Sequence, residues 1–152
     1  MSFAVDTNVL LRCIDDGHVA QLVAINALFA LRDRGEALSI FSQNLIEFWA
    51  VATRPVSSNG LGLSIADAEI EVINLKTLFA LLPDTPEIFS AWEKIVLQYQ
   101  VSGKQAHDAR LVAAMNVHNV THLLTFNTAD FKRFSEITAV SPTTILNDKR
   151  SE

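Results

Sequence analysis

Short apolar runs of strand length alternate along this chain with longer segments of helical pattern, and this alternation constrains the fold more than any other feature. The runs are nearly continuous in apolar residues, which is typical of strands that are covered on both faces. Strands separated by helices form β–α units, and such units build a parallel sheet with helices on each side. The sequence therefore predicts an α/β protein with a parallel sheet at its centre.

Caps and breakers mark the ends of the expected elements. Gly35 stops one helix, Ser64 begins another as its N-cap, and Pro86 occupies the first turn of a third. A loop rich in glycine and polar turn-formers spans Pro55–Ser64. We expect strands at Ser2–Val5, Ala37–Phe41, Phe79–Leu82, His122–Thr125 and Ile137–Val140, and helices at Val9–Ile14, Val19–Arg34, Asn44–Thr53, Ser64–Thr77, Pro86–Tyr99 and Gln105–His118.

The size and composition of the chain fit one globular domain. It has 152 residues, of which 49% are hydrophobic and 19% charged, and this excludes a disordered polyelectrolyte. We expect a single domain over residues 1–147, followed by a polar tail over residues 148–152. Cys13 is the one cysteine, which excludes an intrachain disulfide and a cysteine-based zinc cluster and leads us to expect a reducing compartment.

Hydropathy argues against a membrane protein. The longest near-apolar run, Val19–Leu31, has 13 residues, whereas a membrane-spanning helix needs about 20. The first residues lack the basic and apolar regions of a secretory signal. We therefore expect a soluble, cytoplasmic protein that does not bind membranes.

Polar residues follow two of the expected strands. Asp6 comes directly after the first strand, and Asn127 and Asp130 come just after the fourth. In a parallel sheet covered by helices, ligands bind outside the carboxyl ends of the strands, so these side chains are candidates for a functional site. Taken alone, Asp6 is explained equally well as the N-cap of the next short helix.

Two further acids lie within apolar helical segments. Glu47 has apolar neighbours on every face of its helix, so we expect that helix to be buried, and a buried carboxylate needs a partner or a metal. The alternative is a buried salt bridge from Glu47 to Arg12 or Arg54. Asp108 shares a helix face with apolar residues at positions i+3, i+4 and i+7, which a favourable interaction with the helix N-terminus alone does not explain.

Four acids are thus expected to converge on one pocket: Asp6, Glu47, Asp108 and Asp130, with Asn127 as a neutral oxygen donor. Clustered carboxylates must take up protons or bind cations, and hard oxygen ligands suit Mg²⁺ or Mn²⁺. One or two such ions in the site can activate water and stabilise the leaving oxygen in phosphodiester cleavage. We therefore expect all four acids to be catalytic and all five residues to ligate metal.

Basic residues near these acids in sequence could form a rim that binds phosphate. The formal net charge of −5 argues against a generally basic surface, but without the four site acids the chain has 12 basic and 13 acidic side chains. Arg12 and Lys104 are the preferred candidates, and a solvated surface charge is the alternative for each. The whole set is Arg12, Arg54, Lys104, Arg110, Lys132 and Arg133.

The motifs VDTNVLLR, IEFWAVATRP, HDARLVAAM and LLTFNTADFKRF, in this order and spacing, resemble those of PIN-domain ribonucleases, and more narrowly of the VapC-type toxins of bacterial toxin–antitoxin systems. The resemblance extends from Phe3 to about Leu146. It implies a three-layer α/β/α sandwich with a central parallel sheet of four to five strands. It also implies an endoribonuclease that depends on Mg²⁺ or Mn²⁺.

The resemblance assigns a role to individual residues. Asp6, Glu47 and Asp108 match the first three acids of the family. Many members place the fourth acid where this chain has Asn127, and the nearby Asp130 could replace it. Two further positions complete the match: Asn8 matches a polar residue that supports the first acid, and Thr125 matches a hydroxyl residue at the edge of the site.

The resemblance also implies partners: RNA as substrate, a second copy in a homodimer, and a cognate antitoxin protein laid across a hydrophobic groove. The apolar segment Val19–Leu31 is compatible with such a groove, and equally with a helix at the centre of the domain. Because of Asn127, a non-catalytic PIN-like module that binds RNA or protein is the alternative function. A phosphatase that uses Asp6 as nucleophile is disfavoured, because Asn8 stands where that pattern wants a second aspartate.

Overall fold

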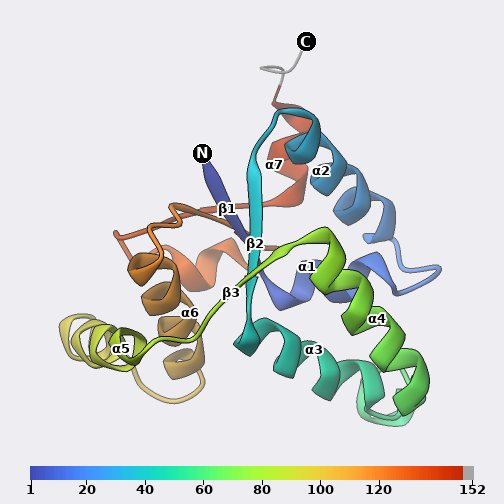
Figure 1. The fold of residues 1–152 in the computed structure, drawn as a ribbon, viewed down its shortest axis with the longest axis horizontal. Helices are drawn as coiled ribbons and strands as arrows, with labels where there is room; N and C mark the ends of the chain where they lie inside the picture. Colours follow the sequence, from blue (N-terminus) through green and yellow to red (C-terminus); the bar gives the residue numbers. More distant parts are fainter. Residues whose placement is uncertain (149–152) are drawn as a thin grey trace.

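A computed structural model describes residues 1–148 of the chain, so residues 149–152 of the expected tail lie outside the described residues. At its centre is a five-stranded sheet in which every neighbouring pair is parallel. The strand order is β3-β2-β1-β4-β5, so the first strand lies in the middle (Figure 1). The strands are β1 (Ser2–Val5), β2 (Ala37–Phe41), β3 (Ala80–Leu82), β4 (His122–Leu124) and β5 (Thr138–Val140).

Helices connect the strands and cover both faces of the sheet, as the alternation in the sequence predicts. The α-helices are α1 (Thr7–Cys13), α2 (Gln21–Asp33), α3 (Ser42–Thr53), α4 (Ile65–Leu78), α5 (Pro86–Gln98), α6 (Gln105–Val117) and α7 (Pro142–Asn147). Two short 3-10 helices, η1 (Val56–Ser58) and η2 (Thr128–Phe131), and helix α7 were not expected. For α7, the signal was present in Ser141, whose hydroxyl accepts from the Thr144 amide as an N-cap, followed by Pro142 at N1.

The alternation of side chains along β1 divides the core into two layers. Phe3 and Val5 pack in a cluster with α1, α2, α3, α4 and α7, whereas Ala4 packs in a second cluster with α5 and α6. Figure 1 shows these two groups of helices on opposite sides of the sheet. The chain is therefore a three-layer α/β/α sandwich with five parallel strands, which confirms the expected fold class.

Helix α3 contradicts the expectation that it is buried all round. Phe48 is fully buried, but Ile46, two residues earlier on the helix, is 69% exposed. The helix packs on α1, α4 and β2, so one of its sides faces solvent although its residues are apolar. Helix α2 likewise is not central in the domain, because Leu22 and Phe29 are 68% and 58% exposed.

Among the described residues, no helix has both the length and the apolar character needed to cross a membrane.

Candidate active site

The predicted site residues gather at the carboxyl edge of the sheet. The register pairs Val5 of β1 with Leu124 of β4, so Asp6 emerges beside Thr125. The Asp6 amide continues this ladder by donating to the Leu124 carbonyl at 2.9 Å. A cleft of about 370 Å³ opens at this edge and is lined by Asp6, Thr7, Asn8, Leu11, Glu47, Ala50, Val51, Arg54, Asp108 and Asn127.

Asp6 is both the N-cap of α1 and a wall of the cleft. Its Oδ1 accepts a hydrogen bond from the Thr7 amide at 2.8 Å, which is the capping contact expected from the sequence. Its Oδ2 accepts from the Thr125 hydroxyl at 2.8 Å. The two readings of Asp6 therefore do not exclude each other, because capping fixes the carboxylate at the mouth of the cleft.

Thr125 and Asn8 form a rigid support for Asp6. The Thr125 hydroxyl is buried and, besides donating to Asp6, accepts from the Asn8 side chain at 3.1 Å and from the Asn127 amide at 3.0 Å. The Asn8 oxygen accepts in turn from the Phe126 amide at 3.1 Å. These contacts tie the loop after β4 to the start of α1, so both residues support Asp6.

Glu47 is held by neutral donors. Its Oε2 accepts from the Thr7 hydroxyl at 3.0 Å, and its Oε1 accepts from the side-chain nitrogen of Gln43 at 2.9 Å. Within residues 1–148, no ion pair involves Glu47, so the alternative of a buried salt bridge to Arg12 or Arg54 is wrong. Glu47 therefore has hydrogen-bond donors but no ion-pair partner in the described part of the chain.

Asp108 lies in the first turn of α6, and Asn127 and Asp130 lie on the segment that follows β4. Asp108 is half-buried and lines the cleft together with Asn127. Asp130 is exposed and is absent from the cleft lining, although its charge acts on Asp108. The structure thus brings Asp6, Glu47, Asp108 and Asn127 together, with Asp130 beside them.

Two carboxylates of the cleft, Asp6 and Asp108, have a raised pKa. The pKa of Asp6 is raised from 3.8 to about 6, mainly by burial and to a smaller extent by the charges of Glu47 and Asp108, against the hydrogen bonds from Thr125 and Thr7. Burial and the charges of Asp130 and Glu47 raise the pKa of Asp108, also to about 6. A cation bound in the cleft would lower the pKa of both Asp6 and Asp108, because its charge stabilises the ionised carboxylates.

The donor set fits Mg²⁺ or Mn²⁺ in chemistry. It consists of carboxylate oxygens with one amide oxygen, which are hard ligands. Within residues 1–148, no three His, Cys, Asp or Glu side chains already converge closely enough to form a closed metal site. Mg²⁺ tolerates such an open arrangement, because it keeps several waters and takes only one or two carboxylates together with substrate phosphate.

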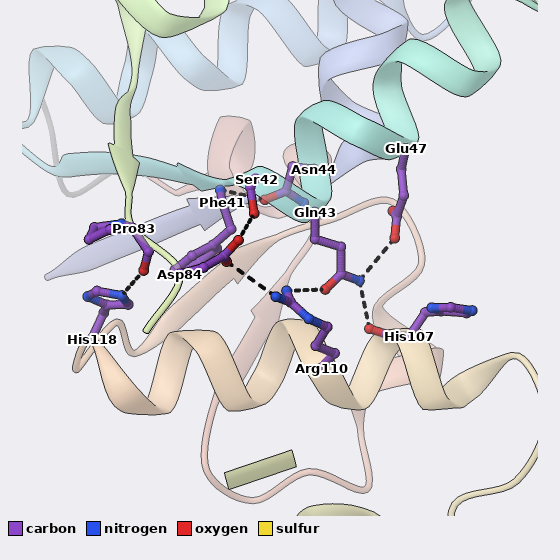
Figure 2. A network of polar contacts seen from close by, with 10 residues as sticks. All are labelled: Phe41, Ser42, Gln43, Asn44, Glu47, Pro83, Asp84, His107, Arg110 and His118. Atoms are coloured by element: carbon purple, nitrogen blue, oxygen red, sulfur yellow. Dashed lines mark hydrogen bonds and ion pairs between the residues drawn. The ribbon is translucent and has the colours of Figure 1, made fainter. Parts of the chain in front are cut away.

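The predicted basic rim is only partly found at the cleft. Arg54 lines it, whereas Arg12 pairs with Asp15 at 2.8 Å, and Lys104 is exposed and is not part of its lining. Arg110 contacts Gln43 and Asp84 (Figure 2). Thr7 and Gln43, which both donate hydrogen bonds to Glu47, were not predicted from the sequence. Gln43 follows β2 by two positions, so the strand-end rule that selected Asp6 could have found it.

Fold and cleft together define an α/β protein with an acidic site at the carboxyl edge of a parallel sheet. The family model described as PIN domain matches residues 3–137. The chain belongs to the PIN domain family, as the motifs predict. No curated protein sequence matches the chain significantly.

Solved structures with the same fold include proteins of toxin–antitoxin systems. VapBC2 from Rickettsia felis, bound to a DNA fragment from its promoter, aligns with a TM-score of 0.69 and 15% identity over 93% of this chain and 98% of that one. VapBC-1 from nontypeable Haemophilus influenzae aligns with a TM-score of 0.70 and 14% identity, over 94% of this chain and 99% of that one. VapC20 from Mycobacterium tuberculosis is described as a toxin that cleaves the sarcin–ricin loop. It aligns with a TM-score of 0.62 and 17% identity, over 87% of this chain and 95% of that one.

Proposed function

We propose that the protein is a metal-dependent endoribonuclease that cleaves RNA phosphodiester bonds, and that it is the toxin of a toxin–antitoxin pair. The observation that carries the proposal is the convergence of Asp6, Glu47 and Asp108 on one cleft without an ion pair to a described basic side chain. Membership of the PIN domain family and the likeness to VapC20 support RNA as the substrate.

In this proposal the three carboxylates hold one or two Mg²⁺ or Mn²⁺ ions, and Asn127 or Asp130 completes the ligand set. A bound ion supplies a lowered pKa for the attacking water and stabilisation of the leaving oxygen. Thr125 keeps Asp6 turned toward the cleft, because its hydroxyl donates to Oδ2. Arg54 lines the same cleft and offers its guanidinium to a backbone phosphate, with Arg12 and Lys104 as more distant phosphate contacts.

Cleavage of a labelled total-RNA pool by the purified protein tests this function. We expect discrete fragments with Mg²⁺ or Mn²⁺, none with EDTA, and none from an Asp6→Ala variant that keeps its circular dichroism spectrum. Thr53→Val is a matched control, because it removes a hydrogen bond to the Trp49 carbonyl outside the cleft lining. An Asp6→Ala protein that still cleaves RNA in the presence of metal would contradict the proposal.

A non-catalytic PIN-like binding module is the second candidate, and the observation that favours it is the presence of a neutral Asn127 in the cleft lining. Such a module binds RNA or protein without metal-stimulated cleavage. Calorimetric titration with Mn²⁺ separates the two candidates, because only a nuclease requires a competent metal site. Saturable Mn²⁺ binding that Asp108→Asn abolishes supports the nuclease.

An apolar groove is the proposed binding site of the antitoxin. It encloses about 170 Å³ and is lined by Cys13, Ile25, Leu28, Phe29, Arg32, Leu38, Leu78 and Phe79. Two of the structural neighbours are toxin–antitoxin complexes, which supports a partner protein of this kind. We further propose a homodimer located in the cytoplasm. Light scattering tests the dimer, and co-purification with the product of a small neighbouring gene tests the antitoxin.

A further inference from the structure

The side-chain amide of Gln43 makes three hydrogen bonds and joins the two helices that carry Glu47 and Asp108. Its nitrogen donates to Glu47 Oε1 at 2.9 Å and to the His107 carbonyl at 2.8 Å. Its oxygen accepts from Arg110 Nη1 at 3.1 Å. Figure 2 shows the amide between α3 and α6, with Glu47 on one side and Arg110 on the other.

Only one orientation of this amide is compatible with its neighbours. In the reverse orientation, the Gln43 oxygen would face a carboxylate and a carbonyl, which are both acceptors, and its nitrogen would face a guanidinium, which has no acceptor. Arg110 therefore favours, together with the two acceptors, the orientation that presents both N–H groups to Glu47 and His107. Arg110 is fixed by Asp84, whose Oδ1 accepts from Nη2 at 3.2 Å and whose other oxygen accepts from Ser42.

We propose that Gln43 is a positioning residue that holds Glu47 for metal binding, and that Arg110 acts through Gln43 by fixing the orientation of its amide. This inference rests on the proposed function, in which Glu47 is a metal ligand.

The geometry explains what the positioning achieves. Each Glu47 oxygen accepts one hydrogen bond from the chain, Oε1 from Gln43 and Oε2 from Thr7. A carboxylate has about four lone-pair sites, so each oxygen keeps capacity for a cation. Gln43 also bonds the residue that precedes Asp108, so the same amide fixes the spacing of the two acids. Loss of a residue that hydrogen-bonds a metal ligand commonly weakens metal affinity about 10–100-fold.

Calorimetric titration of the full chain with Mn²⁺ tests the role of Gln43. Gln43→Met keeps the length of the side chain and removes all three hydrogen bonds, and we expect its Mn²⁺ dissociation constant to rise at least about tenfold. Gln21→Met is the matched control, because the Gln21 amide also donates to a carbonyl and a carboxylate, those of Cys13 at 3.2 Å and Asp16 at 2.8 Å. We expect both variants to lose thermal stability, but Gln21→Met to bind Mn²⁺ like the wild type.

A double-mutant cycle tests whether Arg110 acts through Gln43. Arg110→Met should weaken Mn²⁺ binding, and the double variant Gln43→Met/Arg110→Met should bind no more weakly than Gln43→Met alone. Losses that multiply in the double variant would overturn this part of the proposal. If Gln43→Met does not fold, the comparison of Arg110→Met with Gln21→Met decides instead, and wild-type affinity in Arg110→Met overturns the proposal.

The outcomes distinguish this inference from the proposed function. A wild-type protein that binds no Mn²⁺ overturns both. A wild-type protein that binds Mn²⁺, together with a folded Gln43→Met protein of equal affinity, overturns the positioning role and leaves the proposed nuclease intact.

Discussion

Helix α1 borders two hollows of opposite chemistry. Thr7 and Leu11 line the acidic cleft, whereas Cys13, at the other end of the helix, lines the apolar groove. In the cleft, burial and, to a smaller extent, repulsion between carboxylates raise the pKa of Asp6 and Asp108 to about 6. In the groove, burial raises the pKa of the Cys13 thiol to about 11, which keeps it protonated at neutral pH, and Phe29 is left 58% exposed.

Each hollow is incomplete in its own way. The cleft has unfavourable charge that a cation can relieve, whereas the groove has unfavourable apolar exposure that an apolar partner can cover. The two should therefore respond to different perturbations. A change in one hollow can therefore serve as the control for a change in the other.

The largest effect is expected on cleavage of RNA. Asp108→Asn should reduce the metal-dependent rate by at least about 100-fold, since metal stabilisation of the transition state is worth several kcal/mol and about 1.4 kcal/mol is tenfold in rate. Phe29→Ser, in the groove, should leave the rate unchanged. Both rates are measured on the RNA fragments identified with the total pool, and equal losses in the two variants would show that the hollows are not independent.

The second effect concerns stability against pH in the absence of metal. Between pH 3.8 and about 6, folded Asp6 holds a proton that the unfolded chain has released, so the free energy of unfolding falls as pH rises. The loss should approach about 3 kcal/mol at pH 7, and Asp108 acts in the same direction. Urea unfolding from pH 4 to 8 measures it.

Added Mn²⁺ should restore most of this stability at pH 7, and Glu47→Gln should make the pH dependence somewhat less steep, because it removes a charge that adds to the effect of burial on both pKa values. Phe29→Ser should retain the wild-type slope. A free energy of unfolding that rises between pH 4 and 7 would contradict the electrostatic description of the cleft.

The third effect concerns which residue is the fourth metal ligand. Asn127→Asp adds a carboxylate to the cleft lining, and we expect Mn²⁺ to bind about tenfold more tightly. Asp130→Asn, at an exposed neighbouring position, should weaken binding by a smaller factor if Asn127 is the nearer ligand. Calorimetry gives both values, and the reverse ranking would assign the fourth ligand position to Asp130.

The smallest effect is expected from the groove. Because Phe29 is 58% exposed, Phe29→Ser should change the free energy of unfolding by no more than about 0.5 kcal/mol. It should reduce binding of a fluorescent apolar dye and weaken the proposed complex with an antitoxin protein. A large loss of stability would show that Phe29 belongs to the core.

The fold and most of the cleft could be predicted because they depend on local signals. Apolar runs and caps identify the strands and helices, and the strand-end rule places Asp6 and Asn127 at the same edge. The alternation alone cannot specify the order β3-β2-β1-β4-β5 or the register that brings Asp6 beside Thr125.

What could not be predicted depends on which helix packs where. Glu47 lies on an apolar helix, which suggested burial with a metal or, as the alternative, a salt bridge, yet α3 has an exposed side and Glu47 is held by Thr7 and Gln43. The groove is lined by residues of α1, α2, β2 and α4 together with Phe79, so the apolar segment Val19–Leu31 accounts for only one side of it. Contacts of this kind exist only after tertiary packing.

The placement of β1 between β2 and β4 has a consequence for synthesis of the protein. Asp6 and the Thr125 that orients it are 119 positions apart in the chain, and β4 must be translated before the two can meet. A nascent chain that ends before β4 therefore exposes β1 as a sheet edge and has no complete cleft. For most of elongation the nascent chain therefore lacks the complete cleft, which can form only after the segment that follows β4 has been synthesised.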